Sequence, residues 1–181
     1  MTAPVVEPSS TDMRRCMSAF ATGVTVVSGM NAGNPVGFAC QSFASVSLTP
    51  PLILFCADRR GRAWPLIRAS GRFDVSVLGE DQSDICTRFG SRTGRKFAGL
   101  DWYESQQGTP VLPNVLMRVH CTVESVHVAG DHDVVIGRVV ELSPGDEHRQ
   151  PMLFFRGAFG VDSTRSHVPA PEPWGWGDHW G

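Results

Sequence analysis

The sequence predicts a mainly β protein, a closed or partly closed antiparallel barrel of six to seven strands with a few short helices. Three observations lead to this prediction. Extended segments follow one another at hairpin spacing, 19 Gly and 13 Pro residues supply frequent turns, and strands do not alternate with helices as a doubly wound sheet requires. The 181 residues suit one domain with a sizeable core, and no internal repeat or second domain is evident.

The chain divides into three parts of different composition. Residues 1–12 are expected to be a mobile arm, residues 13–161 the folded domain, and residues 162–181 a tail rich in Pro and Trp. The arm lacks the basic and apolar segments of a signal peptide, and no apolar run is long enough to span a membrane. We therefore expect a cytoplasmic protein. The tail could be a flap over the core, a dimer contact or a disordered end.

The first half of the domain is expected to contain one helix and three strands. Ser9 or Ser10 can cap a helix whose apolar side chains recur at helical spacing until Gly23 ends it. The last strand of this half is an unbroken apolar run, which is typical of a fully buried strand. The predicted strands are 24–30, 36–43 and 52–57, the first two joined by turn residues 31–35.

The second half is expected to add two short helices and four strands. Gly71 and Gly90 are suitable helix stops. Arg156 falls within the last predicted strand among aromatic residues, so a carboxylate or a ligand should compensate its charge. The predicted helices are 64–69 and 81–89, and the predicted strands are 73–77, 117–128, 134–142 and 152–159.

Composition and motifs exclude several function classes. The net charge of −2 argues against bulk binding of nucleic acid or anionic membranes. Five scattered cysteines without a C-x-x-C pair indicate neither a disulfide framework nor a zinc site, and suit buried, reduced thiols. Rossmann, P-loop and nucleophile-elbow glycine motifs are absent. Residues 131–133 and 146–148 could bind a metal, although acidic residues are common at such turns.

Residues 37–56 are the most informative segment. Small hydroxyl residues between two extended segments leave backbone N–H groups uncovered, where a flat anionic ligand could bind. A β-hairpin with a polar edge is the simpler alternative. The basic residues near Phe89 and Phe97 could hold a phosphate or form a solvated loop. His132, just after a tight turn, could reach a ligand at the barrel mouth or lie on the surface.

Taken in order, these segments resemble the short-chain flavin reductases, the flavin reductase-like family with an FMN-binding split barrel. Members are the reductase components of two-component flavin-dependent monooxygenases. Residues 37–45 are also similar to reductases of aromatic-ring and sterol-ring hydroxylating systems. The resemblance covers residues 13–161 and includes 20–27, 37–56, Arg88-Phe89, Lys96-Phe97, Gly130-Asp131-His132, Gly137 and Phe155-Arg156-Gly157.

The resemblance implies a split β-barrel with Greek-key, antiparallel order, and a homodimer with flavin in a groove near the interface. It implies that NADH or NADPH reduces FMN or FAD, and that the reduced flavin diffuses to a separate oxygenase component. Hydride passes directly between the cofactors, so no catalytic side chain and no metal is expected. Neither nucleic acid nor membrane is an expected partner.

The resemblance also assigns site residues. The nicotinamide side is expected to be His132 and Arg156. The chain has Ala39-Cys40-Gln41-Ser42 where the commoner family version has Thr-Ala-Asn-Ser. The expected flavin-binding residues are Ala39, Cys40, Gln41, Ser42, Ser45, Ser47, Cys56, Ala57, Asp58, Arg62, Phe89 and Lys96.

Two alternative functions stay open on the sequence alone. One is a flavin- or haem-binding split-barrel protein without reductase turnover, for which a His after a Gly-Asp turn has no evident use. The other is a metal-dependent enzyme that uses His132, Asp133 and His148, which loss of activity on chelation would support.

Overall fold

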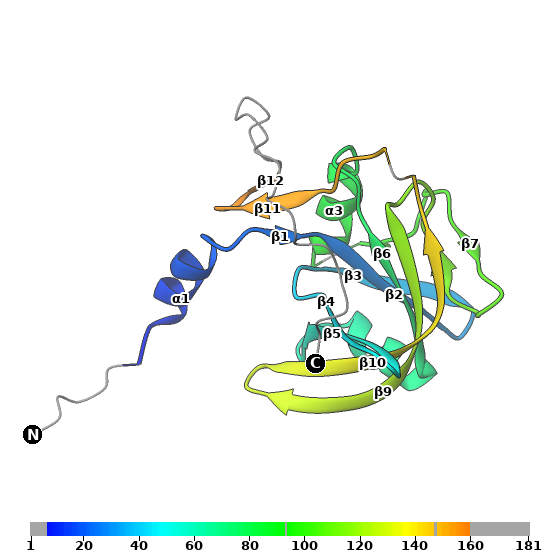
Figure 1. Cartoon of the computed structure of the whole chain (residues 1–181), viewed down its shortest axis with the longest axis horizontal. Helices are drawn as coiled ribbons and strands as arrows, with labels where there is room; N and C mark the ends of the chain where they lie inside the picture. Colours follow the sequence, from blue (N-terminus) through cyan, green and yellow to red (C-terminus); the bar gives the residue numbers. More distant parts are fainter. Residues whose placement is uncertain (1–6, 93, 147, 160–181) are drawn as a thin grey trace, which may run out of the picture.

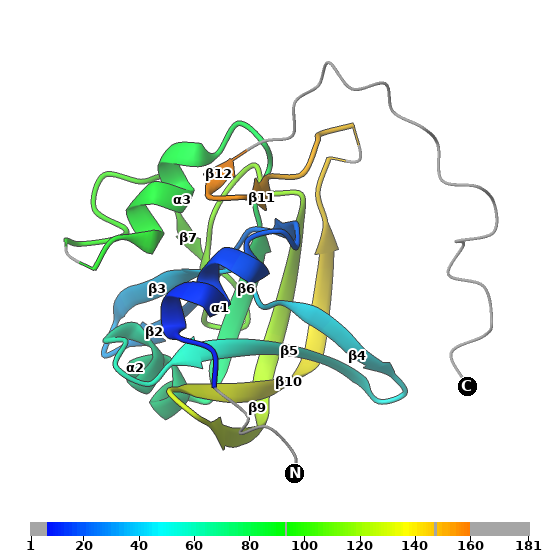
Figure 2. The same cartoon turned by 90° about the vertical axis from the view of Figure 1, so that its left-hand side faces the viewer.

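A computed structural model of the chain describes residues 7–92, 94–146 and 148–159. A strongly curved seven-stranded sheet in the order β3-β2-β6-β9-β10-β5-β4 dominates the fold, and all its pairings are antiparallel (Figures 1 and 2). The prediction of a mainly β, antiparallel split barrel is confirmed. The strands are β2 (Thr25–Asn31), β3 (Asn34–Cys40), β4 (Ala44–Leu48), β5 (Pro51–Asp58), β6 (Arg72–Val77), β9 (Met117–Ala129) and β10 (His132–Pro144).

Two small sheets and three short helices complete the described part of the chain. A three-stranded sheet and a two-stranded hairpin lie at the side of the large sheet. The small strands are β1 (Thr22–Gly23), β11 (Leu153–Phe155) and β12 (Ala158–Phe159) in one sheet, and β7 (Tyr103–Glu104) and β8 (Pro110–Val111) in the other. The helices are α1 (Ser10–Met17), α2 (Ala63–Ser70) and α3 (Ser83–Gly90).

Local sequence explains the main chain reversals. The β2–β3 hairpin closes through Ala32 and Gly33, both at positive φ (47° and 77°). A two-residue turn needs these φ values to match the twist of the two strands. Gly71 ends α2 with a φ of 70°, in the left-handed conformation that glycine adopts without strain. The Ser9 hydroxyl caps α1 by accepting a hydrogen bond from the backbone N–H of Asp12.

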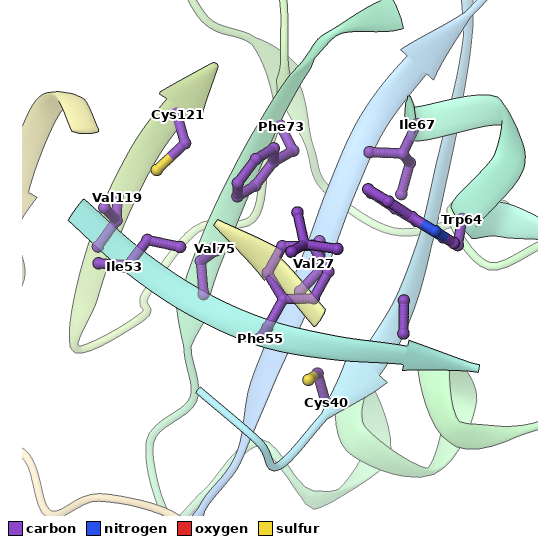
Figure 3. Close-up of a cluster of buried hydrophobic side chains, with 12 residues drawn as sticks. Val27, Cys40, Ile53, Phe55, Trp64, Ile67, Phe73, Val75, Val119 and Cys121 are labelled. Carbon is purple, nitrogen blue, oxygen red and sulfur yellow. The ribbon is translucent and has the colours of Figure 1, made fainter. Parts of the chain in front are cut away.

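The larger hydrophobic core lies inside the curved sheet and is closed by α2 (Figure 3). Phe55 is fully buried at its centre, with ring centroids 5.6 Å from Trp64 and 5.2 Å from Phe73 in edge-to-face arrangements. A Cβ on Gly137 would lie 2.5 Å from the Phe73 ring, so this close approach of β10 to β6 requires glycine. A second core cluster, around Leu78, Phe89 and Leu112, packs beside it.

Several predicted boundaries are wrong. The predicted last strand, 152–159, is a hairpin of two short strands, because Arg156 and Gly157 take positive φ values (50° and 82°) and turn the chain. Helix α1 ends at Met17, before Gly23, and its first residues belong to the segment expected to be an arm.

Other differences concern the segment around the predicted ligand site. The strand predicted over 36–43 ends at Cys40, and β4 is an additional strand. The run 52–57 is fully buried only at alternate residues, so one side of β5 stays partly exposed. The tail residues 162–181 and residues 1–6 of the arm lie outside the described part of the chain.

Candidate functional site

The seam of the split barrel is formed by the end of β3 and the strand β5. After Cys40 the chain leaves β3, and the Ser42 hydroxyl accepts a hydrogen bond from the backbone N–H of Cys56 at 2.8 Å. The same hydroxyl lies 3.3 Å from the Cys56 carbonyl oxygen, to which it donates. Ser42 thus forms hydrogen bonds with both the N–H and the C=O of Cys56. Cys56 lies past the part of β5 that pairs with β4. Gln41 and Ser42 are exposed at this seam.

Cys40 supports the seam from the inside. Its Sγ lies 3.3 Å from the Ser42 hydroxyl and 3.8 Å from the Cys56 carbonyl oxygen. Burial raises the pKa of the Cys40 thiol, which keeps it protonated and unreactive at neutral pH. Cys40, Ser42 and Cys56, which the family resemblance assigned to flavin binding, are therefore in mutual contact.

The C-terminal end of β5 and the turn between β9 and β10 together form a polar cluster. Asp58 lies opposite His132 in the register of the two strands. The His132 Nδ1 atom is 2.7 Å from a carboxylate oxygen of Asp131, and Arg60 lies within 3.5 Å of Asp58 and 3.9 Å of Asp131. The hydrogen bond with His132 lowers the pKa of Asp131, so this carboxylate is ionised. The His132 side chain is 42% exposed.

A second group of charges is cationic. Lys96 donates hydrogen bonds to the carbonyl oxygens of Arg88, at 2.8 Å, and of Ser91. Arg62, just before α2, donates to the Arg92 carbonyl and so connects α2 to the same loop. Burial, together with the nearby Arg62 guanidinium, lowers the pKa of Lys96. Two neighbouring cationic side chains favour the binding of an anion.

Four predicted flavin residues lie in the core or on the edge strand β4. The Phe89 side chain is 2% exposed and packs edge-to-face on Phe97 at 5.0 Å, so only its backbone could contact a ligand. Ala57 is fully buried in the larger core. Ser45 and Ser47 lie on β4, opposite Ile53 and Leu52 of β5.

Arg156 and Ala39 are the remaining predicted site residues, and each has its own surroundings. Arg156 occupies the tip of the β11–β12 hairpin, where its guanidinium carbon is 5.1 Å from the centre of the Phe155 ring. Its backbone N–H donates to the Ser18 carbonyl, on the side of α1. The interpretation that Arg156 needs compensation inside a strand is therefore wrong, because the residue is exposed at a turn. Ala39 is half-buried against the second core cluster.

Sequence reasoning missed the role of two buried carboxylates. Asp133, considered only as a metal ligand, is 5% exposed and accepts a hydrogen bond from the Trp64 indole N–H at 2.8 Å. Asp74 is fully buried on the side of β6 that faces away from Phe55 and accepts a hydrogen bond from Ser76 at 2.8 Å. An acidic residue within an apolar strand was the available signal in both cases.

The Asp74 carboxyl belongs to a polar cluster with His120 and Thr109. One Asp74 oxygen lies 3.3 Å from His120 Nδ1, which is also 3.0 Å from the Thr109 hydroxyl. Burial raises the pKa of Asp74 to about 7, against the opposing effect of the Ser76 hydrogen bond, and burial lowers the pKa of His120. Both shifts favour the neutral forms of the two groups.

The comparisons with known proteins identify the family. The model described as "Flavin reductase like domain" matches residues 17–161. The chain belongs to this family. It is 50% identical over 159 residues to the reductase subunit HsaB of a flavin-dependent monooxygenase from Rhodococcus jostii, covering 87% of this chain and 80% of that one. It is 39% identical over 152 residues to an FMN reductase (NADH), SmoA, from Agrobacterium fabrum, covering 84% and 86%.

Solved structures of similar proteins have the same fold. The nitrilotriacetate monooxygenase component B from Mycobacterium thermoresistibile superposes with a TM-score of 0.82 at 48% identity, over 87% of this chain and 89% of that one. The NADH:FAD oxidoreductase SgcE6 from Streptomyces globisporus, in complex with NAD and FAD fragments, gives 0.82 at 30% identity, over 91% and 100%.

The described residues also bear on the metal alternative and on membrane segments. Within 7–92, 94–146 and 148–159, no three His, Cys, Asp or Glu side chains are grouped so that they could hold a metal ion. Glu147, part of one candidate set, lies outside these ranges. No helix in the same ranges has the length and apolar character needed to cross a membrane.

Proposed function

We propose that this chain is an NAD(P)H-dependent flavin reductase that reduces FMN or FAD and supplies the reduced flavin to a separate monooxygenase. The seam and His132 lie at the C-terminal end of β5 and Arg62 follows this strand in the chain, which supports the proposal. Relatives with the same family domain are named as a monooxygenase reductase subunit, an NADH-dependent FMN reductase and an NADH:FAD oxidoreductase. Because the reaction consumes a nicotinamide cofactor, we place the protein in the cytoplasm.

The seam would bind the isoalloxazine edge. Gln41 and Ser42 are exposed beside the end of β5, where their backbone N–H groups would donate hydrogen bonds to a ring that becomes more negative on reduction. Ser45 and Ser47 would lie along the ribityl chain, and Asp58 at the end of the strand. Arg62 and Lys96 would bind the phosphate, because they are the paired cations of the adjoining loops.

His132 would orient the nicotinamide. It is half-buried at the start of β10, opposite the end of β5, and Asp131 fixes its ring through a hydrogen bond to Nδ1. Nicotinamide and flavin carry the hydride transfer, so the protein's task is to stack and orient the two rings. No acid or base is required of the side chains that surround them.

The second copy of a homodimer would cover the apolar surface that one chain leaves open. Helix α1 buries none of its residues and stands away from the barrel (Figure 1). Its Met13 and Met17 are more than half exposed, and Leu48 on the edge strand β4 is 73% exposed. An eight-residue helix that buries no side chain is not stable by itself in water, which supports an intermolecular contact. The flavin groove would then be completed at the interface.

Steady-state oxidation of NADH and of NADPH, with and without added flavin, tests the function. We expect oxidation that depends on both the protein and a free flavin, with FMN and FAD compared at equal concentration. Flavin binding without any nicotinamide oxidation would instead support the alternative of a non-catalytic flavin-binding protein. The absence of both would overturn the proposal.

A further inference from the structure

Asp133 is a buried carboxylate with three partners on one neighbouring segment. Its Oδ2 accepts the Trp64 indole N–H at 2.8 Å and lies 3.7 Å from the Arg68 guanidinium. Its Oδ1 lies 3.6 Å from Arg59 and makes no hydrogen bond with the described residues. Both arginine side chains are about half exposed, at 50% and 56%. The indole therefore supplies the one short, buried hydrogen bond of this carboxylate within the described ranges.

Core packing does not require a carboxylate at this place. Burying a charge that has only one direct hydrogen bond is costly compared with an apolar residue of similar size. Trp64 is 2% exposed and already packs on Phe55, so the ring would be buried without Asp133. The contribution of Asp133 is to orient Trp64. The hydrogen bond from the indole N–H to Asp133 fixes the rotation of the ring and the position of the first turn of α2.

Trp64 is the side chain that anchors the start of α2. Arg62, at the N-cap position of this helix, makes no capping hydrogen bond, and Trp64 belongs to the first helical turn. The preceding loop is tied at its beginning, where the Arg60 N–H donates to the Asp58 side chain at 2.8 Å and the Gly61 N–H to the Asp58 carbonyl at 2.9 Å. The position of Arg62 therefore depends on what holds Trp64.

Arg62 in turn connects α2 to the loop that carries Lys96. Its guanidinium donates to the Arg92 carbonyl, and it lies close enough to Lys96 to lower the pKa of that amine. Asp133 is thus connected to Trp64 by a hydrogen bond, Trp64 to Arg62 by the backbone at the start of α2, and Arg62 to the loop of Lys96. Asp133 itself follows His132 directly in β10.

We propose that Asp133 is a positioning residue for the flavin phosphate: through the Trp64 indole it sets the first turn of α2 and hence the place of Arg62. This inference rests on the proposed function, which assigns the phosphate to Arg62 and Lys96. Asp133 does not contact the ligand in this account. Its effect is confined to flavins that carry a phosphate.

Binding of FMN and of riboflavin, which lacks the phosphate, to matched variants tests this role. Asp133→Ala and Trp64→Phe break the hydrogen bond from its two sides, whereas Asp133→Asn keeps an acceptor for the indole N–H. We expect Asp133→Ala and Trp64→Phe each to raise the Kd for FMN about fivefold. A change of this size corresponds to the free energy of one hydrogen bond. Asp133→Asn should stay within about twofold, and riboflavin binding should be unchanged in all three.

A double variant distinguishes a positioning role of Asp133 from a direct electrostatic effect of its carboxylate on the phosphate. In an Arg62→Ala background, Trp64→Phe should cause no further loss of FMN affinity, because the residue being positioned is gone. Tighter FMN binding by both Asp133→Ala and Asp133→Asn would overturn the inference, since it would mean that Asp133 merely repels the phosphate. Equal losses for FMN and riboflavin would also overturn it, as would unchanged FMN binding by whichever variant folds.

Failure of the inference and failure of the proposed function are distinguishable. If the wild-type protein oxidises NADH with FMN but the variants bind FMN normally, only the role of Asp133 is refuted. If the wild-type protein binds neither flavin, the proposed function itself is refuted. Thermal denaturation of each variant establishes that it is folded under the binding conditions.

Discussion

Replacing Asp74 with Asn should stabilise the protein at neutral and alkaline pH. Asp74 is fully buried, its Oδ2 makes no hydrogen bond with the described residues, and burial raises its pKa from the ordinary 3.8 to about 7. In the unfolded chain the carboxyl loses its proton near its ordinary pKa. The folded protein keeps that proton until about pH 7, so the ionised form is penalised only in the fold.

The magnitude follows from the size of this pKa change. At about 1.36 kcal/mol per pKa unit, a change of the pKa from 3.8 to about 7 corresponds to a ceiling of about 4 kcal/mol. The effect on folding stability has the sign expected of an acid whose pKa is raised in the fold. Below the unfolded pKa, burying the protonated Asp74 costs no ionisation energy, and stability is lost progressively as the pH rises from about 4 to about 7. The amide side chain of the Asp74→Asn variant would resemble the protonated acid in shape and still accept the Ser76 hydrogen bond.

Denaturant unfolding of the wild type and of Asp74→Asn at several pH values measures this effect. At about pH 8 the variant should be more stable by a few kcal/mol, or up to roughly 10 °C in Tm for a chain of this size. At about pH 4.5 the difference should fall to about 1 kcal/mol, and it should nearly vanish below the unfolded pKa of 3.8. Asp101→Asn, at an exposed position, is the matched control and should show no such trend.

One result would refute this reasoning. If the stability difference between the wild type and Asp74→Asn is the same at every pH from about 5 to about 8, Asp74 does not titrate in that range. The carboxylate would then be ionised throughout and paired with a protonated His120, whose Nδ1 lies 3.3 Å away.

Three further predictions concern the proposed site and assembly. His132→Ala should raise the KM for NADH about fivefold, the effect of one lost hydrogen bond, with flavin affinity within about twofold; an unaltered KM would remove His132 from the nicotinamide site. Lys96→Ala should weaken binding of FMN and FAD about tenfold, through loss of a charge-assisted bond, while riboflavin binding stays the same; equal losses for all three flavins would mean that Lys96 does not contact the phosphate. Met17→Asp should convert the proposed dimer into a monomer in light scattering, because it places a charge on the exposed apolar side of α1; a wild-type protein that is already monomeric would contradict the proposed dimer.

Sequence patterns predicted the main sheet because local signals there agree with the fold. The turn residues between β2 and β3 and the long alternating segment of β9 placed their strands to within a few residues. Periodicity could not reveal that the last predicted strand folds back on itself. Arg156 adopts a positive φ that its residue type rarely takes, and only the pairing of Phe155 with Ala158 makes the hairpin evident.

Site residues close together in sequence were easier to predict than those joined by the fold. The assignment of Cys40, Ser42 and Cys56 to one site came from family resemblance, and their mutual contact came from the structure, since nothing in the residues alone specifies that two strands meet at an open seam. The orientation of Phe89 could not be predicted because an aromatic residue among basic ones can face either a ligand or the core, and the 2% exposure of its side chain places it in the core. The Asp133–Trp64 hydrogen bond joins residues 69 positions apart and has no local signature.

Anaerobic mixing of the protein with NADH and FMN tests the central claim most directly. If the seam and His132 bring the two rings together, the yellow colour of oxidised flavin should bleach at a rate proportional to protein concentration, with one NADH consumed per flavin reduced. Bound FMN that stays oxidised in the presence of excess NADH would contradict the account.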